Sequence, residues 1–109
     1  MPHIRMRGID KNKLLRVSEA LIADVSQISG APESHFTLEL IATEFIAGGQ
    51  VQVGEAFCEV LWFDRPQAVQ DQVAQAITQH LKKLEPNQDV VVVFTGLEKN
   101  KYYENGLHF

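Results

Sequence analysis

The first eight residues, MPHIRMRG (1–8), alternate apolar and polar side chains. An extended chain places alternate residues on opposite sides, so this pattern is typical of a β-strand with two unlike faces. The apolar side holds Pro2, Ile4 and Met6, and the polar side holds His3, Arg5 and Arg7. Gly8 ends the pattern. The stretch predicts an opening strand that faces a core on one side only.

A helix and a second strand are predicted next. Asp10 is placed to cap a first turn, and apolar residues then recur at helical spacing. The stripe consists of Leu14, Leu21, Val25 and Ile28. Gly30 and Pro32 end the helix. The segment FTLELI (36–41) alternates again as a strand, and the alternation slips at Ile41 as a bend or bulge would make it.

The remaining chain predicts two strong strands and one helix. A turn around a short strand at 51–53 is followed by a strand at FCEVLWF (57–63). Pro66 is expected just inside the start of a helix. The β-branched run DVVVVF (89–94) is typical of a central strand that is covered on both faces and has parallel neighbours. An aromatic tail, punctuated by glycine, ends the chain.

The two halves of the sequence predict the same order of elements. Strands begin at 2 and 57, helices at 10 and 66, and strands again at 36 and 89. We therefore expect one α+β domain over residues 1–109, with pseudo-repeats at about 2–54 and 57–109. Two β-α-β units of one hand predict a four-stranded mixed sheet with both helices on one face. A ferredoxin-like sheet with antiparallel pairing is the alternative.

Composition narrows the class of partner. The 14 acidic and 10 basic residues give a net charge of −4, and the basic residues do not cluster. Nucleic acids and anionic membranes are therefore not expected as partners, because both need concentrated positive charge. No run approaches the ~20 apolar residues of a membrane span, and the start lacks a signal peptide, so we expect a cytoplasmic protein. The single cysteine, Cys58, is expected to be a buried small hydrophobe.

The sequence lacks the common motifs of metal sites, phosphate-binding sites and nucleophilic enzymes. The histidines show no spacing typical of metal ligands, and no phosphate-binding loop or nucleophile motif occurs. No metal and no cofactor are therefore expected. Lys99 and Lys101 are expected to form a solvated stretch.

Pro2 is the candidate catalytic residue. Removal of Met1 would leave a secondary amine at the start of a strand. An α-amine titrates at roughly 7.7 to 8.0, and burial lowers its pKa because the ammonium loses solvation. Such an amine can abstract a proton next to a carbonyl near neutral pH.

The chain resembles the tautomerase superfamily over its whole length. The similarity lies in Pro2, the duplicated β-α-β order, the Gly30-Ala31-Pro32 loop and the aromatic tail ending in Phe109. It is nearest to the macrophage migration inhibitory factor branch, as a bacterial family within the superfamily. The resemblance implies a homotrimer with sites at subunit boundaries. It also implies that Pro2 is the general base and acid of keto-enol tautomerisation, and that cationic side chains hold the substrate carboxylate.

The sequence departs from that superfamily at three positions. Ala31 replaces the loop lysine, and Val91 and Val93 stand where the branch has tyrosine and asparagine. Arg65 is the best substitute cation, since it lies near a predicted helix N-terminus that itself favours anions. Its other interpretation is an exposed arginine beside a helix cap.

Further candidates for substrate contact are cationic or aromatic. Arg5 and Arg7 are alternative cations, although their spacing also fits cross-strand pairs with Glu39 and Glu59. The candidate aromatic walls of a pocket are Phe63, Tyr102 and Tyr103. The tail that carries the tyrosines is equally suited to packing on a neighbouring subunit.

Two functions follow from this sequence. The first is a trimeric tautomerase that moves a proton between carbon and oxygen of a small 2-oxo acid or related carboxylate, with Pro2 as base. The second is an oligomeric binding or structural protein that keeps the fold without the chemistry. The ferredoxin-like alternative would make it a ligand-binding dimer.

Overall fold

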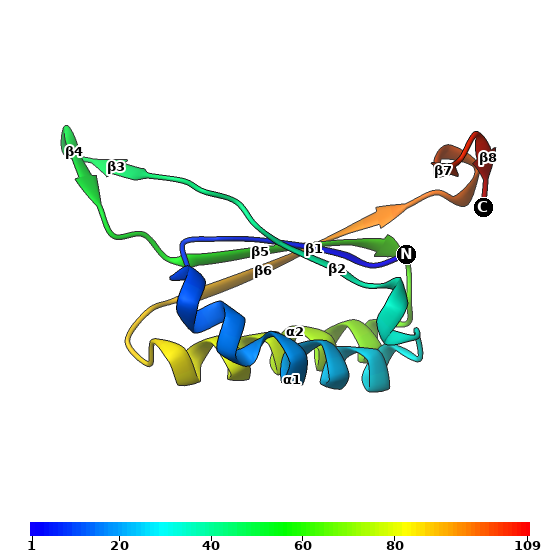
Figure 1. Cartoon of the computed structure of the whole chain (residues 1–109), viewed down its shortest axis with the longest axis horizontal. Helices are drawn as coiled ribbons and strands as arrows, with labels where there is room; N and C mark the ends of the chain where they lie inside the picture. The colour runs from blue at the N-terminus through cyan, green and yellow to red at the C-terminus, as the bar shows by residue number, and fades with distance from the viewer.

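The elements follow the predicted order, with two additional hairpins (Figure 1). The computed structural model describes residues 1–109. Its helices and strands are β1 (His3–Arg7), α1 (Lys11–Ser29), β2 (Thr37–Leu40), β3 (Phe45–Ala47), β4 (Gln50–Gln52), β5 (Ala56–Phe63), α2 (Gln67–Leu84), β6 (Val90–Leu97), β7 (Tyr103–Glu104) and β8 (Leu107–His108). Two short 3-10 helices, Glu33–His35 and Lys99–Lys101, precede β2 and β7.

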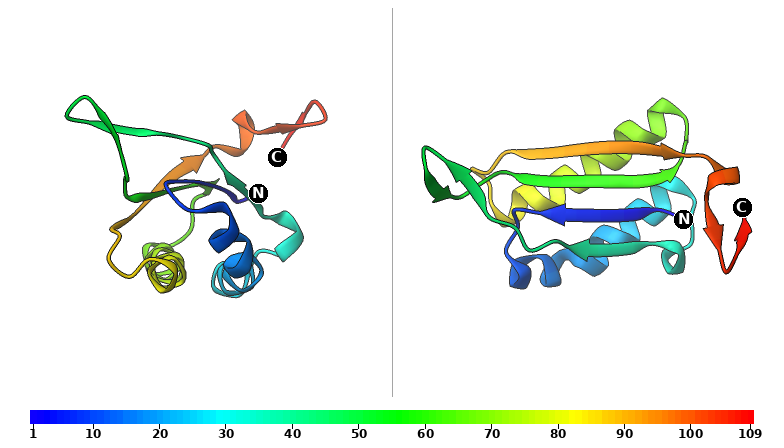
Figure 2. Two further views of the ribbon diagram at one scale, coloured as in Figure 1. Left: turned by 60° about the vertical axis from the view of Figure 1, so that its left-hand side comes forward. Right: turned by 90° about the horizontal axis from the view of Figure 1, so that it is seen from above.

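Four strands form the central sheet in the order β2-β1-β5-β6. The β1–β2 and β5–β6 pairs are parallel, and β1 and β5 join the halves in antiparallel fashion. Both helices lie in one layer against a single face (Figures 1 and 2). The predicted α+β fold with a duplicated β-α-β unit is confirmed. The ferredoxin-like alternative is wrong, because each half pairs its two strands in parallel.

The core lies between the helices and the sheet face that they cover. Its twelve buried members are Ile4, Met6, Leu14, Leu21, Val25, Ala56, Cys58, Val60, Trp62, Val73, Ile77 and Leu81. They come from the alternate strand positions and the helical stripes that the sequence predicts. Cys58 is buried as expected, and burial raises the pKa of its thiol to about 12, with a further contribution from the charge of Glu59.

The helix boundaries follow local chemistry. The Asp10 carboxylate accepts a 3.1 Å hydrogen bond from the Lys13 amide, which satisfies a free donor at the start of α1. Gly30 caps the other end of this helix. Pro66 lies just outside α2 as its N-cap, so its predicted place inside the helix is wrong by one position. None of the helices is long and apolar enough to cross a membrane.

Two predictions about the strands need correction. The short strand expected at 51–53 belongs to a β3–β4 hairpin, whose turn is made by Gly48 and Gly49, both with positive φ. The run at 89–94 is not a central strand, since β6 lies at the edge of the sheet and pairs only with β5. Its helix side is covered, whereas its other side belongs to an uncovered sheet face.

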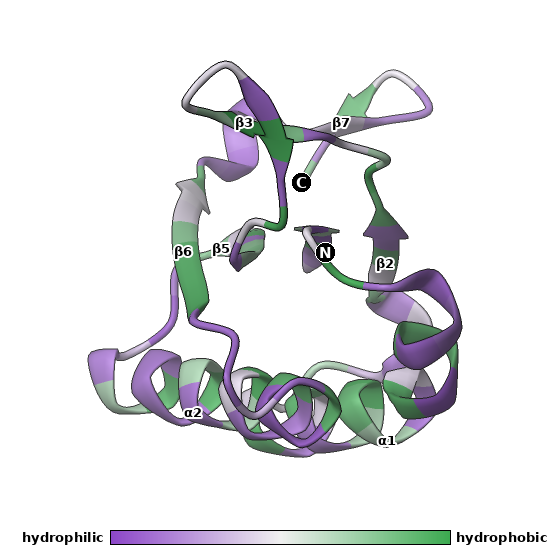
Figure 3. Cartoon of the chain, turned by 90° about the vertical axis from the view of Figure 1, so that its left-hand side faces the viewer, coloured by the Kyte–Doolittle hydropathy of each residue, from purple (hydrophilic) through white to green (hydrophobic).

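That uncovered face has a mixed character. It is opposite the helical layer, on the side where the β3 and β7 hairpins rise from the sheet (Figure 3). Alternation places polar residues of β1 there beside half-buried Leu61 of β5 and exposed Val93 of β6. The face combines one ion pair, Arg5–Glu39, with exposed apolar surface.

Candidate active site

Pro2 lies at one end of the sheet, where both ends of the chain are found (Figure 2). Its side chain is fully buried. Its carbonyl accepts a 3.1 Å hydrogen bond from the Thr37 amide, which extends the contact between β1 and β2. A cavity of about 370 Å³ opens beside it, a volume in the range of small-molecule sites, roughly 300–1,000 Å³.

Segments far apart in the sequence form the walls of this cavity. They are the start of β1, the loop after α1, the end of β5 with the residues that follow it, and the tail. The lining includes Pro2, Ala31, Phe63, Arg65, Lys99 and Phe109. No aspartate or glutamate side chain lines the cavity. Its charged side chains are therefore cationic.

Main-chain carbonyls and an aromatic ring hold Arg65. Its Nη1 donates a 2.9 Å hydrogen bond to the Phe63 carbonyl, and its Nε donates one of 3.4 Å to the Ser29 carbonyl. The guanidinium carbon lies 4.8 Å from the centre of the Trp62 ring. Partial burial lowers the pKa of Arg65 from its usual value of 12.5. The group stays charged at neutral pH and has no carboxylate partner in the chain.

The amino-terminal amine lies at the same cavity. Burial lowers the pKa of the Met1 amine from its usual value of 8.0, and the positive charge of Arg65 lowers it further. Lys99 has a smaller effect in the same direction, while Glu104 opposes it. The site thus makes the ammonium form of this amine less favourable than it is in water.

Three aromatic rings cluster beside the cavity. The Tyr102 ring centre lies 5.4 Å from that of Phe63 and 5.0 Å from that of Phe109, and the two phenylalanine rings are 5.5 Å apart. Tyr103 does not join them, because its ring packs against His108 and is 62% exposed. Of the three predicted aromatic residues, Phe63 lines the cavity, Tyr102 packs behind that ring without lining the cavity, and Tyr103 lies outside the cluster.

Arg5 and Arg7 do not line the cavity and extend instead over the uncovered sheet face. Arg5 Nε donates a 2.7 Å hydrogen bond to Glu39, which lies opposite Arg5 in the parallel register. The predicted ion pair is confirmed there. The ion pair predicted for Arg7 is wrong. Its guanidinium carbon lies 4.3 Å from the centre of the Phe57 ring, and Phe57 is the residue opposite Arg7 on β5.

Two ionisable side chains of the lining were missed by the sequence analysis. Lys99 lines the cavity, with its Nζ 5.7 Å from the centre of the Phe63 ring. His35, from the 3-10 helix before β2, lines the opening as well. No local pattern identifies either residue, because both reach the site through the return of distant segments to the start of β1.

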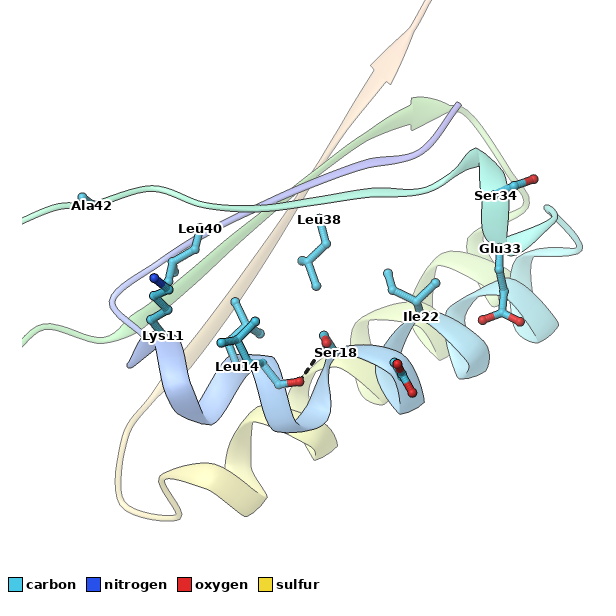
Figure 4. A pocket seen from close by; sticks show the side chains of 11 residues that line it. Lys11, Leu14, Ser18, Ile22, Glu33, Ser34, Leu38, Leu40 and Ala42 are labelled. Atoms are coloured by element: carbon cyan, nitrogen blue, oxygen red, sulfur yellow. Dashed lines mark hydrogen bonds between the residues drawn. The ribbon is translucent and has the colours of Figure 1, made fainter.

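A larger groove lies between α1 and the edge strand β2 (Figure 4). Its volume is about 970 Å³, and its apolar lining includes Leu14, Ile22 and Leu38. None of the residues predicted to act in catalysis or substrate binding lines it. Of the residues predicted from the sequence to act in catalysis or substrate binding, Pro2, Phe63 and Arg65 line the smaller cavity.

Comparisons with known proteins agree with this architecture. Residues 1–108 match the family described as domain of unknown function DUF1904. A crystal structure of a DUF1904 domain from Sebaldella termitidis is 39% identical, with full coverage of both chains and a TM-score of 0.94. No curated protein matches the sequence.

More distant structures share the fold alone. A macrophage migration inhibitory factor-like protein from Entamoeba histolytica is 15% identical, with 99% and 98% of the two chains covered and a TM-score of 0.77. A fused 4-OT protein, described as an asymmetric trimer, is 10% identical, with 97% and 94% covered and a TM-score of 0.81. The chain therefore belongs to the DUF1904 family, and it shares its fold with the macrophage migration inhibitory factor-like and 4-OT proteins.

Proposed function

We propose that this protein is a cofactor-independent tautomerase of small 2-oxo acids or related carboxylates, with the Pro2 nitrogen as general base and acid. One observation carries the proposal. Pro2, fully buried and next to the amino terminus, lies at a cavity whose charged side chains, Arg65 and Lys99, are both cationic. A site of this kind suits an anionic substrate that exchanges a proton at carbon.

The first requirement is a free amine. With Met1 present, the Pro2 nitrogen is an amide and has no basicity, so the active form needs Met1 to be removed. The environment would lower the pKa of the resulting secondary amine, since burial and Arg65 already lower that of the Met1 amine beside it. A larger fraction of the amine would then be neutral near pH 7 than for the same amine in water.

The proposed steps balance without a cofactor. The neutral Pro2 nitrogen takes a proton from the carbon next to the carbonyl, and the C–H electron pair becomes the C=C bond of the enol. The C=O π pair moves onto the carbonyl oxygen, which takes up a proton from water, and the protonated proline returns to the neutral amine by releasing its proton to water. In the reverse direction, the enol oxygen gives its proton to water, and the protonated proline delivers a proton to carbon. Arg65 would hold the carboxylate, and Lys99 would stabilise the charge that develops on oxygen.

We further propose a homotrimer assembled through the uncovered sheet face. The charged residues of β1 and β5 lie on this face, and the edge strand β6 borders it. Glu59 of β5 forms no ion pair within the chain. The fused 4-OT protein with the same fold is described as a trimer. A neighbouring subunit would also complete the walls of the Pro2 cavity.

A second candidate is an oligomeric binding protein. Ala31 lines the cavity without supplying a cation, and Val91 and Val93 of β6 supply no polar group. These residues favour anion binding by Arg65 without turnover.

Ketonisation of phenylenolpyruvate distinguishes the two candidates. The test uses untagged protein whose amino terminus is shown by mass spectrometry to be Pro2, beside a Pro2→Ala control. We expect turnover, followed by ultraviolet absorbance, to fall to background in the control. Equal rates in both proteins, across a panel of 2-oxo acids, would reject the catalytic proposal and favour the binding protein.

A further inference from the structure

The tail of the chain, residues 98–109, folds back on itself. Strands β7 and β8 form a hairpin, and the Phe109 amide donates a 3.0 Å hydrogen bond to the Tyr102 carbonyl. This bond places the Phe109 ring beside the Tyr102 ring. The tail is therefore one unit, and the position of Tyr102 also sets the position of Phe109.

His3 joins this tail to the sheet. Its Nε2 lies 2.6 Å from the Tyr102 hydroxyl, and its Nδ1 lies 2.7 Å from the Thr37 hydroxyl. The His3 and Tyr102 rings are stacked, with centres 5.8 Å apart. A neutral imidazole has one donor and one acceptor, and a hydroxyl can serve in either role, so both bonds form with an uncharged ring. The contact bridges 99 residues of sequence.

Tyr102 transmits this contact to the cavity. Its ring packs edge-on against both Phe63 and Phe109, and those two rings line the cavity at Pro2. His3 itself does not line the cavity. Its side chain therefore reaches the aromatic wall of the cavity through Tyr102.

We propose that His3 is a positioning residue that sets the aromatic wall of the Pro2 cavity by holding the Tyr102 hydroxyl. The inference concerns the same cavity as the proposed tautomerase, and its kinetic consequence rests on that function. Its structural consequence, the placement of three rings, does not depend on catalysis.

Two amide substitutions at His3 separate the roles of the two ring nitrogens. The glutamine amide of His3→Gln reaches the position of Nε2 and keeps the bond to Tyr102. The shorter amide of His3→Asn reaches only the position of Nδ1 and keeps the bond to Thr37. Tyr102→Phe removes the hydroxyl alone, and Tyr103→Phe is its matched control at the adjacent tyrosine, which makes no such bond.

The first readout is the set of nuclear Overhauser contacts among the Phe63, Tyr102 and Phe109 rings. We expect these contacts to weaken in His3→Asn and Tyr102→Phe and to persist in His3→Gln and Tyr103→Phe. The second readout is KM for phenylenolpyruvate in protein that begins at Pro2. We expect a rise of about fivefold in the first pair of variants, with a smaller change in kcat, as the loss of one hydrogen bond implies.

The inference is overturned if the ring contacts survive in both His3→Asn and Tyr102→Phe, or if His3→Gln loses them as fully as His3→Asn. A wild-type protein without proline-dependent turnover would reject the proposed function, and the ring contacts would then decide the role of His3 by themselves.

Discussion

Arg65 Nη1 lies 2.9 Å from the carbonyl oxygen of Phe63, two residues earlier in the chain, and donates a hydrogen bond to it. The contact folds the arginine back across the end of β5, beside Pro2. Carbonyl oxygens hold the guanidinium without neutralising its charge. A fixed cation without a carboxylate partner is a suitable group for holding the carboxylate of a substrate.

Replacing Arg65 should weaken carboxylate binding. In Arg65→Met we expect KM for phenylenolpyruvate to rise about tenfold or more, because a charge-assisted hydrogen bond is lost. Arg65→Lys should recover only part of the loss, since lysine lacks the planar, forked set of donors. Arg16→Met, at an exposed position of α1, is the control and should behave like the wild type. Equal KM values in Arg65→Met and Arg16→Met would exclude Arg65 as the anion holder.

The amino-terminal amine should titrate below its usual value. In the chain that carries Met1, burial and Arg65 both disfavour the ammonium, so its pKa lies below 8.0. NMR titration of the Met1 Hα signal should show a lowered value in the wild type, and Arg65→Met should move it upward. Lys99→Met should give a smaller change in the same direction.

The lowered pKa of the Met1 amine also determines the direction in which the free energy of unfolding changes with pH. At pH values between the pKa of the amine in the folded chain and 8.0, the unfolded chain binds more protons than the folded chain. The free energy of unfolding therefore rises with pH in that range. This stabilisation by the amine is lost at pH values below its pKa in the folded chain. A Met1 amine that titrates at 8.0 or higher in the folded wild type would contradict the prediction.

Two glycines of similar backbone conformation should differ in their tolerance of alanine. Gly8 and Gly30 have φ of +80° and +78°, but a Cβ at Gly8 would lie 2.3 Å from the Glu55 carbonyl oxygen, whereas nothing lies within 4 Å at Gly30. Gly30→Ala should cost about 1 kcal/mol from backbone strain alone. Gly8→Ala should cost a further ~1–3 kcal/mol because main-chain atoms must move. Urea unfolding measures both, and equal losses would refute the close approach at Gly8.

The uncovered sheet face can be tested by its effect on assembly. We expect the wild type to sediment as a trimer. Val93→Lys, at a 40% exposed position of β6, should yield monomers, because a buried lysine without a partner is costly in an interface. Gln72→Lys adds the same charge at an exposed position of α2, and this variant should remain a trimer. A monomeric wild type, or a trimeric Val93→Lys, would argue against this interface.

The local pattern was sufficient to predict the layers of the fold. Ile4 and Met6 face the core because period-2 alternation has only one arrangement that buries its apolar side. The caps at Asp10 and Gly30 were likewise predictable, since each satisfies backbone groups within its own turn. Such features depend on residues a few positions apart.

Contacts between residues far apart in the sequence determine the position of β6 in the sheet and the side of the cavity that the tail forms. Valines at four successive positions fit a central strand, and they equally fit an edge strand whose second face awaits another chain. Lys99 and Phe109 reach Pro2 only because the tail returns to the start of β1. The single polar group that anchors this return is Tyr102, whose partner His3 has no local signature of that role.

Strand β6 also has a consequence for handling the isolated chain. Residues Val90–Leu97 contain neither a charged residue nor a proline, although edge strands usually carry one or the other as a guard against pairing with foreign strands. The opposite edge, β2, is shorter and carries Glu39. An unassembled protomer would therefore present an aggregation-prone template along β6. Mild denaturant, which would dissociate the proposed trimer, should favour precipitation over a stable free subunit.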